Sequence, residues 1–275
     1  MNDVPMTRAW SAGTVAVGGR PRHVHPLVVG YEPIPESLSL LGGDPARYLL
    51  EPVTAVAVVY DEGWVLLDSG FNVDIVRDPA LRARHFNFDS YTAVVPPGDP
   101  LADGIAAAGL SWDDLAGCAI SHVHVDHTGG LRLLSPDVPV LMQRAEWDYG
   151  STRATTADAV IVSDFTRPGL DIVLLDGDTA LAPGLEAVDT SGHTPGHQSF
   201  AISLASSRIV LACDAADLRA NITGRIPCGS TMRPGDADAA RVAIERLHAL
   251  DAEDGTEVWP GHDPDWWAWK RSIVS

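Results

Sequence analysis

One short segment of the chain holds four side chains that can bind metal ions, since residues 122–127 read His-Val-His-Val-Asp-His. The segment directly follows an apolar stretch, residues 117–121, that has the character of a β-strand. Residues two apart on an extended segment point the same way, so His122 and His124 can share one metal ion. Asp126 and His127 lie beyond the strand end and can face a second ion beside the first. The residue types and their spacing therefore predict a metal centre.

Three further candidate ligands occur later in the chain, each at the end of a predicted strand or in the loop after it. His197 ends a Gly- and Pro-rich turn, residues 191–197, and His262 follows a short apolar stretch, Glu257–Trp259. Asp214 ends an apolar hairpin. Another histidine of the same turn, His193, is interpreted as a structural or supporting residue. Loops that follow strand ends are where an open α/β sheet presents its site.

These candidates are five imidazoles and two carboxylates, with no thiolate. Such a set suits zinc, and also manganese, iron or cobalt. A carboxylate can bridge two cations about 3.5–4 Å apart with a hydroxide between them. Two such ions lower the pKa of the bound water and polarise a carbonyl or phosphoryl oxygen, so no serine or cysteine nucleophile is required.

The elements that must position these side chains are mixed strands and helices. Residues 53–60 and 64–67 read as one hairpin ending on Asp68, and residues 200–204 and 208–213 as a second ending on Asp214. Helices are expected from Asp99-Pro100 onward and from residues 234–236 to about Leu250. Shorter strands are expected at residues 118–121, 138–142, 172–175, 185–189 and 257–259. This mixture predicts a layered α/β or α+β domain.

The length of 275 residues, without a low-complexity tract or a long Ser/Gly linker, predicts one domain over residues 1–275. Residues 1–50 contain six prolines and show little periodicity. We therefore expect a loop-rich N-terminal segment that covers a surface or a site.

The composition excludes several classes of partner. The chain has 19 Lys and Arg against 37 Asp and Glu, a formal charge of −18. This charge argues against binding to nucleic acid and to anionic membrane surfaces. Its longest apolar runs are far shorter than the roughly 20 residues that span a bilayer.

The cysteines and the N-terminal residues indicate the cellular compartment. The three cysteines, Cys118, Cys213 and Cys228, form no Cys-x-x-Cys pair and cannot all pair with one another. The first residues lack the basic and apolar regions of a signal peptide. Together these features predict a cytoplasmic protein.

The motif set resembles that of the metallo-β-lactamase superfamily. The shared features are the His-x-His-x-Asp-His segment, the later Thr-Pro-Gly-His, the aspartate after a hairpin and the late Gly-His, spread over residues 53–263. This resemblance implies a four-layer αββα sandwich with a two-metal site between two sheets. It implies that His122, His124 and His197 hold one ion, that Asp126, His127 and His262 hold the other, and that Asp214 bridges them. Asp68 matches an acidic position that orients ligands.

Within the superfamily the chain is most similar to N-acyl homoserine lactone lactonases, on residues 70–72, 121–130, 194–199 and 261–263. This likeness implies quorum quenching: a metal-bridging hydroxide attacks the lactone carbonyl, and Asp126 protonates the leaving alkoxide. It also implies a small lactone or ester substrate and a homodimer. Two positions depart from that subfamily. Asp217 stands where a tyrosine often holds the carbonyl, and Val125 stands where an aromatic is common.

Because a carboxylate stabilises an oxyanion only when protonated, Asp217 leaves the substrate open. One alternative is a hydrolase of esters, thioesters or phosphodiesters on the same site. Another is an iron-dependent oxidoreductase, although a set of ligands for two metals argues against a mononuclear dioxygenase. A third is a metal-binding protein without catalysis, although no ligand position is lost.

Overall fold

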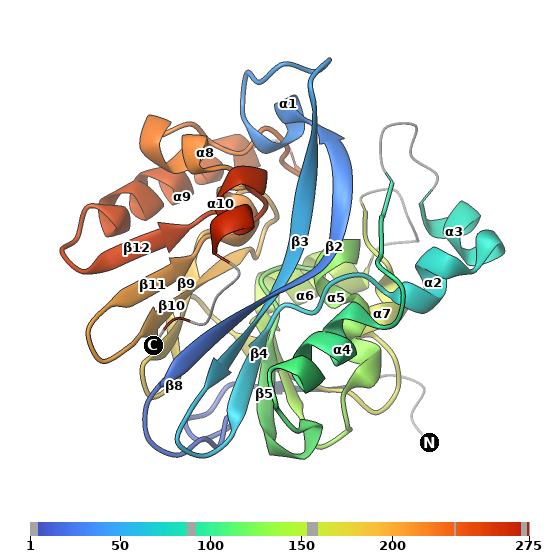
Figure 1. The fold of residues 1–275 in the computed structure, drawn as a ribbon, viewed down its shortest axis with the longest axis vertical. Helices are drawn as coiled ribbons and strands as arrows, with labels where there is room; N and C mark the ends of the chain where they lie inside the picture. The colour runs from blue at the N-terminus through green and yellow to red at the C-terminus, as the bar shows by residue number, and fades with distance from the viewer. Residues whose placement is uncertain (1–4, 87–91, 153–158, 234, 271–273, 275) are drawn as a thin grey trace.

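The strands of the computed structural model assemble into two sheets (Figure 1). The structure describes residues 5–86, 92–152, 159–233, 235–270 and 274. The first sheet has the order β1-β7-β6-β5-β4-β3-β2. Its strands are β1 Met6–Ala9, β2 His23–Pro35, β3 Tyr48–Val59, β4 Trp64–Leu67, β5 Leu115–Ala119, β6 Pro139–Gln143 and β7 Asp171–Leu175.

The second sheet has the order β12-β11-β10-β9-β8 and comes wholly from the C-terminal part of the chain. Its strands are antiparallel except for β11 and β12, which are parallel. Its strands are β8 Thr179–Ala182, β9 Leu185–Asp189, β10 Gln198–Ser203, β11 Arg208–Leu211 and β12 Thr256–Trp259. Both predicted hairpins are confirmed, as β3–β4 in the first sheet and β10–β11 in the second.

Helices cover the outer face of each sheet. The predicted helix after Asp99 is α4, whose N-terminus the Asp99 side chain caps through the amide of Ala102. The helices are α1 Glu36–Ser39, α2 Val73–Arg77, α3 Pro79–His85, α4 Pro100–Ala107, α5 Val125–Thr128, α6 Arg144–Ser151, α7 Val162–Phe165, α8 Arg219–Gly224, α9 Asp236–Asp251 and α10 Pro264–Trp269. Short 3₁₀ turns are η1 Trp112–Asp114, η2 Gly129–Leu133 and η3 Cys213–Ala215.

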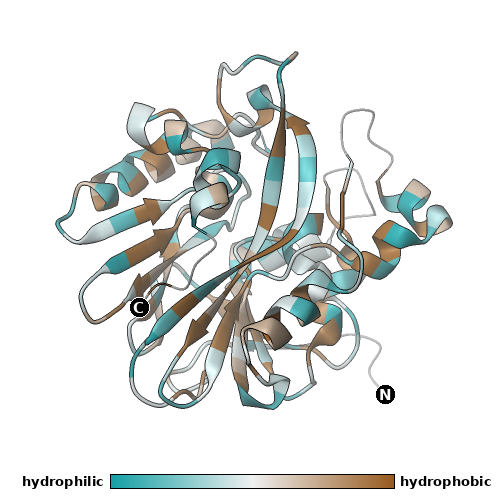
Figure 2. Cartoon of the chain, viewed as in Figure 1, coloured by the Kyte–Doolittle hydropathy of each residue, from teal (hydrophilic) through white to brown (hydrophobic). Residues whose placement is uncertain are grey.

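Three apolar layers hold these elements together. One lies between the first sheet and the helices from α2 to α7, and another joins the facing sides of the two sheets. The third lies between the second sheet and helices α8 and α9. Apolar segments run along the strands of both sheets, whereas the turns and outer helix faces are more polar (Figure 2). Helix, sheet, sheet and helix therefore stack in the predicted four-layer order.

The expectation of a loop-rich segment over residues 1–50 is wrong. Residues 23–35 form β2, which pairs antiparallel with β3 from His23↔Val59 to Pro35↔Tyr48. The prolines that suggested a loop, Pro26, Pro33 and Pro35, lie in this strand, which is at the edge of the first sheet. An edge strand has one side without ladder hydrogen bonds, so it tolerates residues that lack an N–H.

Candidate metal centre

Parallel neighbouring strands bring the first candidate residues to one sheet edge. β4 and β5 are parallel and pair Leu67 with Ala119. Asp68 follows β4 and the segment from His122 follows β5, so both emerge at the carboxyl ends of adjacent strands. The segment then enters α5, which turns Asp126 and His127 back toward the sheet end.

The second sheet supplies the other candidates in the same way. β11 and β12 are parallel and pair Leu211 with Trp259, so the loops that carry Asp214 and His262 are neighbours. His193 lies in the loop between β9 and β10. Gly261 is required here, because a Cβ atom on it would lie 2.6 Å from the carbonyl oxygen of Cys213.

The backbone takes an unusual conformation at the end of each hairpin. Asp68 has φ 56° and Cys213, directly before Asp214, has φ 48°. The left-handed region is unfavourable for residues other than glycine, and such residues concentrate at functional sites.

The first group of ligand atoms consists of three histidine nitrogens and one carboxylate oxygen. His124 Nδ1 lies 3.0 Å from His122 Nε2 and 3.0 Å from His193 Nε2. Asp214 Oδ2 lies 3.5 Å from His122 Nε2 and 3.4 Å from His193 Nε2. All four residues are buried, and their ligand atoms lie within 4.8 Å of one another.

The second group faces the other oxygen of the same carboxylate. Asp214 Oδ1 lies 3.2 Å from His127 Nε2 and 3.0 Å from His262 Nε2. Asp126 Oδ2 lies 3.0 Å from His127 Nε2 and 3.8 Å from His262 Nε2. Asp214 therefore stands between two groups of ligand atoms, with one oxygen toward each.

The spacing of these atoms fits metal ions. Four ligands at about 2.0–2.1 Å from one zinc ion stand about 3.3 Å apart in a tetrahedron. The distances given above for the two groups, 3.0 to 3.8 Å, lie around this value. His127 Nε2 is buried beside two carboxylates yet forms no hydrogen bond of acceptable geometry, as expected of a nitrogen that binds a cation.

His193 stands in this first group, and the predicted ligand His197 lies beside it. His197 is fully buried, and its Nδ1 lies 2.9 Å from Thr190 Oγ1. Its ring centre is 5.2 Å from that of His122, while its Nε2 has no hydrogen-bond partner among the described residues. The two histidines stand four residues apart in the same turn, and the rings of both lie close to that of His122. An unpartnered buried nitrogen is also what His127 offers, so His197 stays a candidate ligand.

Burial sets the charge state of the first group. Removal from water lowers the pKa of His124 to about 3, with help from His193, and also lowers the pKa of His122 and His193. These imidazoles are therefore neutral near pH 7, which is the form that binds metal ions.

In the second group, neighbouring carboxylates raise the pKa of the histidines instead of burial lowering it. Burial opposes a positive charge on His127, but Asp126 and Asp214 outweigh it and raise the pKa of that imidazole. Burial likewise opposes a charge on His262, but Asp214 outweighs it and raises its pKa. A field that attracts a proton to this group also attracts a cation.

The other ring nitrogen of four ligand histidines faces a polar partner. Such contacts fix the ring orientation and the tautomer of a metal-binding imidazole. The Nδ1 contacts are His122 with Ser121 Oγ at 3.0 Å, His127 with Asp68 Oδ2 at 2.9 Å, His193 with the Ser230 carbonyl at 3.2 Å and His262 with the Pro52 carbonyl at 3.0 Å. Asp68 thus contacts a candidate ligand, as the sequence predicts.

Asp217 lies beside the second group, where Asp214, Asp217 and His262 have ligand atoms within 4.8 Å of one another. Its side chain is buried, and its Oδ1 has no hydrogen-bond partner among the described residues. Burial and the neighbouring Asp214 raise the pKa of its carboxyl well above the usual value.

Sequence reasoning missed Glu146, a fully buried acid on α6 that hydrogen-bonds to the backbone beside the metal-ligand candidates. A single glutamate in a helical stretch carries no signal of this role.

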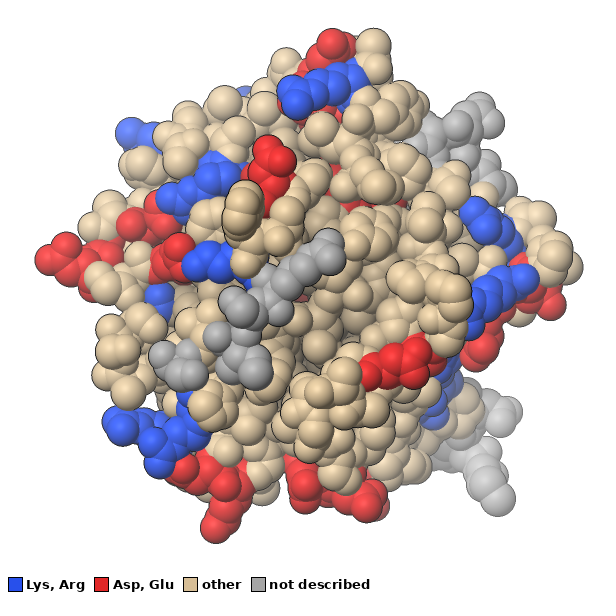
Figure 3. Space-filling view, viewed as in Figure 1, with Lys and Arg blue, Asp and Glu red and all other residues tan. Residues whose placement is uncertain are grey.

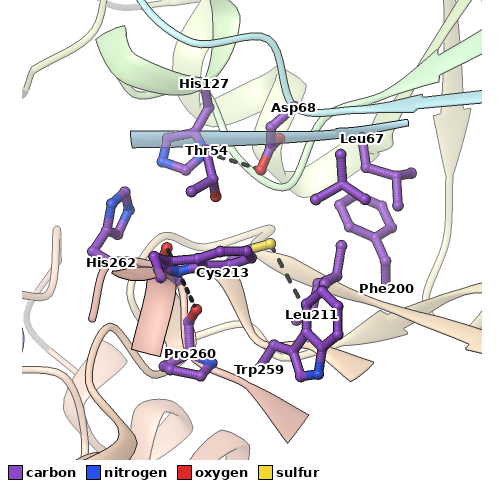
Figure 4. A pocket seen from close by; sticks show the side chains of 13 residues that line it. Thr54, Leu67, Asp68, His127, Phe200, Leu211, Cys213, Trp259, Pro260 and His262 are labelled. Atoms are coloured by element: carbon purple, nitrogen blue, oxygen red, sulfur yellow. Dashed lines mark hydrogen bonds and ion pairs between the residues drawn. The ribbon is translucent and has the colours of Figure 1, made fainter. Parts of the chain in front are cut away.

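A small internal cavity of about 20 Å³ lies between the sheets, against His127 and His262 (Figure 4). Thr54, Leu67 and Asp68 line it from the first sheet, and Phe200, Leu211 and Trp259 from the second. A space of this size holds no more than one water molecule. The side chains that line this cavity are therefore closely packed.

The visible face of the molecule carries its charged side chains mainly toward the edges, around a largely uncharged middle (Figure 3). Within the described residues, no helix combines the length and the apolar character that crossing a bilayer requires.

Comparisons with known proteins agree with this geometry. The sequence model of the metallo-beta-lactamase superfamily matches residues 49–272. An N-acyl homoserine lactonase from Bacillus cereus is 28% identical over 220 residues, covering 80% of this chain and 84% of the relative. The N-acyl homoserine lactonase AttM from Agrobacterium fabrum is 30% identical over 236 residues, covering 82% of this chain and 87% of the relative.

Solved structures share the fold. An N-acyl homoserine lactone hydrolase with the product N-hexanoyl-L-homoserine bound matches with a TM-score of 0.78 and 22% identity, over 93% of this chain and 100% of that chain. The dizinc quorum-quenching lactonase AidC matches with a TM-score of 0.64 and 17% identity, over 93% of this chain and 91% of that chain. With its four layers and its paired ligand groups, the chain belongs to the metallo-beta-lactamase superfamily.

Proposed function

We propose that this chain is a two-metal hydrolase that opens the ring of N-acyl homoserine lactones and so quenches quorum sensing. The placement of the Asp214 carboxylate, with one oxygen toward each group of ligand atoms, carries this proposal. The relatives named N-acyl homoserine lactonase support the substrate class.

The proposed ligands of one ion are His122 and His124 with either His193 or the sequence-predicted His197. Those of the other ion are Asp126, His127 and His262, and Asp214 is shared. We propose zinc as the metal, because the set joins nitrogen and oxygen ligands without a thiolate. Manganese, iron and cobalt accept the same ligand types.

Two divalent ions bound here would polarise the ester carbonyl and activate a water molecule. The chain would handle the protons. Asp126 would pass a proton to the alkoxide that leaves when the ring opens. Burial and Asp214 raise the pKa of Asp217, and in its protonated form this carboxyl would donate a hydrogen bond to an oxygen of the substrate.

The test is a substrate panel on zinc-loaded protein. We expect metal-dependent ring opening of acyl homoserine lactones with acyl chains of several lengths. The protons that the reaction releases measure its rate. Simple esters, thioesters and phosphodiesters form the second arm, because a carboxyl at Asp217 favours no single acyl substrate. Turnover in that arm, with none on any lactone, would overturn the lactonase proposal.

We further propose that the chain works in the cytoplasm as a homodimer without nucleic-acid partners. The cysteines Cys118, Cys213 and Cys228 are free and buried, which agrees with a reducing compartment. Light scattering at micromolar concentration measures the oligomeric state directly, and a monomer mass would remove the homodimer from this proposal.

A further inference from the structure

Glu146, at the start of α6, accepts hydrogen bonds from two separate loops. Its Oε1 accepts from the Val123 amide at 2.9 Å. Its Oε2 accepts from Thr194 Oγ1 at 2.7 Å and from the Gly196 amide at 2.9 Å. The side chain is fully buried, so these three contacts replace water around the carboxylate.

Both loops carry proposed ligands of the same metal ion. Val123 lies between His122 and His124 in the chain, and Thr194 directly follows His193. The first loop follows a strand of the first sheet, and the second joins two strands of the other. One carboxylate therefore connects the two parts of the fold that must meet to complete the first group of ligand atoms.

The contact leaves no room for adjustment. A Cβ atom on Gly196 would lie 2.1 Å from the Glu146 amide nitrogen, so the loop packs directly on the helix start. A side chain at position 196 would therefore displace this loop from α6.

The second group of ligand atoms has a different support. Asp68 Oδ2 lies 2.9 Å from His127 Nδ1, and Asp68 Oδ1 accepts from the Ser121 amide at 2.7 Å. Among the contacts that the structure describes for Glu146, none reaches Asp126, His127 or His262.

We propose that Glu146 is a positioning residue dedicated to the first metal ion: it holds His122 and His124 at the spacing from His193 that one cation requires. Asp68 contacts the second-group ligand His127 directly and reaches the first group only through Ser121. The inference rests on the two-metal centre proposed above and adds a division of labour between two buried carboxylates.

The test measures both zinc dissociation constants by competition with a chromophoric chelator. In Glu146→Gln at least one of three buried donors loses its acceptor. We therefore expect the zinc dissociation constant of the first group to rise 10- to 100-fold. The other constant should stay within threefold of wild type. His193→Ala, which lacks a first-group ligand, identifies the constant that belongs to the second group.

Asp68→Asn is the comparison variant. It should raise the second-group dissociation constant more than the first, because Asp68 contacts His127 directly and His122 only through Ser121. Gly196→Ala keeps the carboxylate but displaces its loop, so it should repeat the effect of Glu146→Gln. Asn221→Ala is the control for general destabilisation, because Asn221 is a buried side chain that holds four backbone groups elsewhere. It should leave both constants unchanged.

Equal weakening of both constants in Glu146→Gln, or wild-type constants in that variant, would overturn the inference. Lactone turnover is not part of this measurement. Suppose that the variants change the two zinc dissociation constants as expected, but the protein opens no lactone. The proposed activity would then be wrong, and this inference would stand.

Discussion

At the scale of single residues, His193 and His197 differ in what surrounds their ring nitrogens. His193 Nε2 lies near His124 and Asp214, whereas His197 contacts Thr190 through Nδ1 and its ring lies beside those of His122 and His193. Both histidines belong to one Gly-His-Thr-Pro-Gly-His turn, so sequence spacing favours neither. The continuous His-x-His-x-Asp-His segment was predictable because its geometry follows from one strand end, while a tight turn can aim either of two imidazoles.

We predict that His193→Ala lowers the metal content of the protein by one ion per chain and removes most turnover, because three-coordinate sites bind weakly. His197→Ala should retain two ions and lose stability only. Elemental analysis after dialysis against a weak chelator measures how many metal ions each variant retains. Two ions in His193→Ala and one in His197→Ala would restore the assignment expected from the sequence.

A second residue-scale prediction concerns Asp164, a buried carboxyl that accepts a hydrogen bond from Asn72 Nδ2 at 2.7 Å. Burial raises its pKa from 3.8 to about 7. Between these values the folded state holds a proton that the unfolded state has released, so stability falls as pH rises from about 4 to 7.

In Asp164→Asn this pH dependence should disappear. Relative to wild type, the variant should gain about 2–3 kcal/mol between pH 5 and pH 8, at 1.36 kcal/mol per pKa unit. Urea unfolding at both pH values measures the difference. An unchanged difference would show that Asp164 is already ionised at pH 5.

At the scale of elements, the strands that position the site were predictable from apolar runs, and the N-terminal strand was not. The run from Val53 to Tyr60 and the run after Ala116 are apolar on both faces because each lies in the interior of the sheet. β2 lies at the edge, where prolines are tolerated and apolar alternation is weaker. Composition alone could not distinguish such a strand from a loop.

The last helix, α10, holds the loop that carries His262. Trp267 is 2% exposed, packs edge-on against Trp259, and donates its indole N–H to the carbonyls of Pro260 and Gly261 at 2.9 Å each. Trp267→Ala should cost about 3–5 kcal/mol of stability. Trp267→Phe keeps most of the packing but lacks the donor, so a smaller loss with weaker second-ion binding is expected.

Thermal unfolding and zinc titration of both variants give the two readouts. A Phe variant with normal zinc binding would mean that the indole hydrogen bonds do not hold the His262 loop. The exposed Trp269→Phe, on the same helix, is the matched control.

At the scale of the whole molecule, the cations join two sheets that otherwise meet through apolar packing. His122, His124, Asp126 and His127 follow the first sheet, and the remaining proposed ligands belong to the second. The formal charge of −18 adds repulsion that bound cations reduce at the point where buried carboxylates are closest.

Removal of metal should therefore destabilise the entire fold. Each occupied site contributes about 2.7 kcal/mol when free zinc exceeds its dissociation constant a hundredfold. For two sites we expect EDTA to lower the Tm by about 10 °C or more. EDTA saturated with zinc beforehand is the control, and an unchanged Tm would contradict a joint role for the ions.

The order of the strands has one more consequence. β1 to β7 make up the first sheet and β8 to β12 the second, so the ladders between named strands do not cross the turn at Gly177. A polypeptide severed at Gly177 would yield two fragments, each with its own complete sheet and each with only part of the ligands. Association of the two fragments would then depend on the apolar faces of both sheets and on bound cations together, so added zinc should strengthen it.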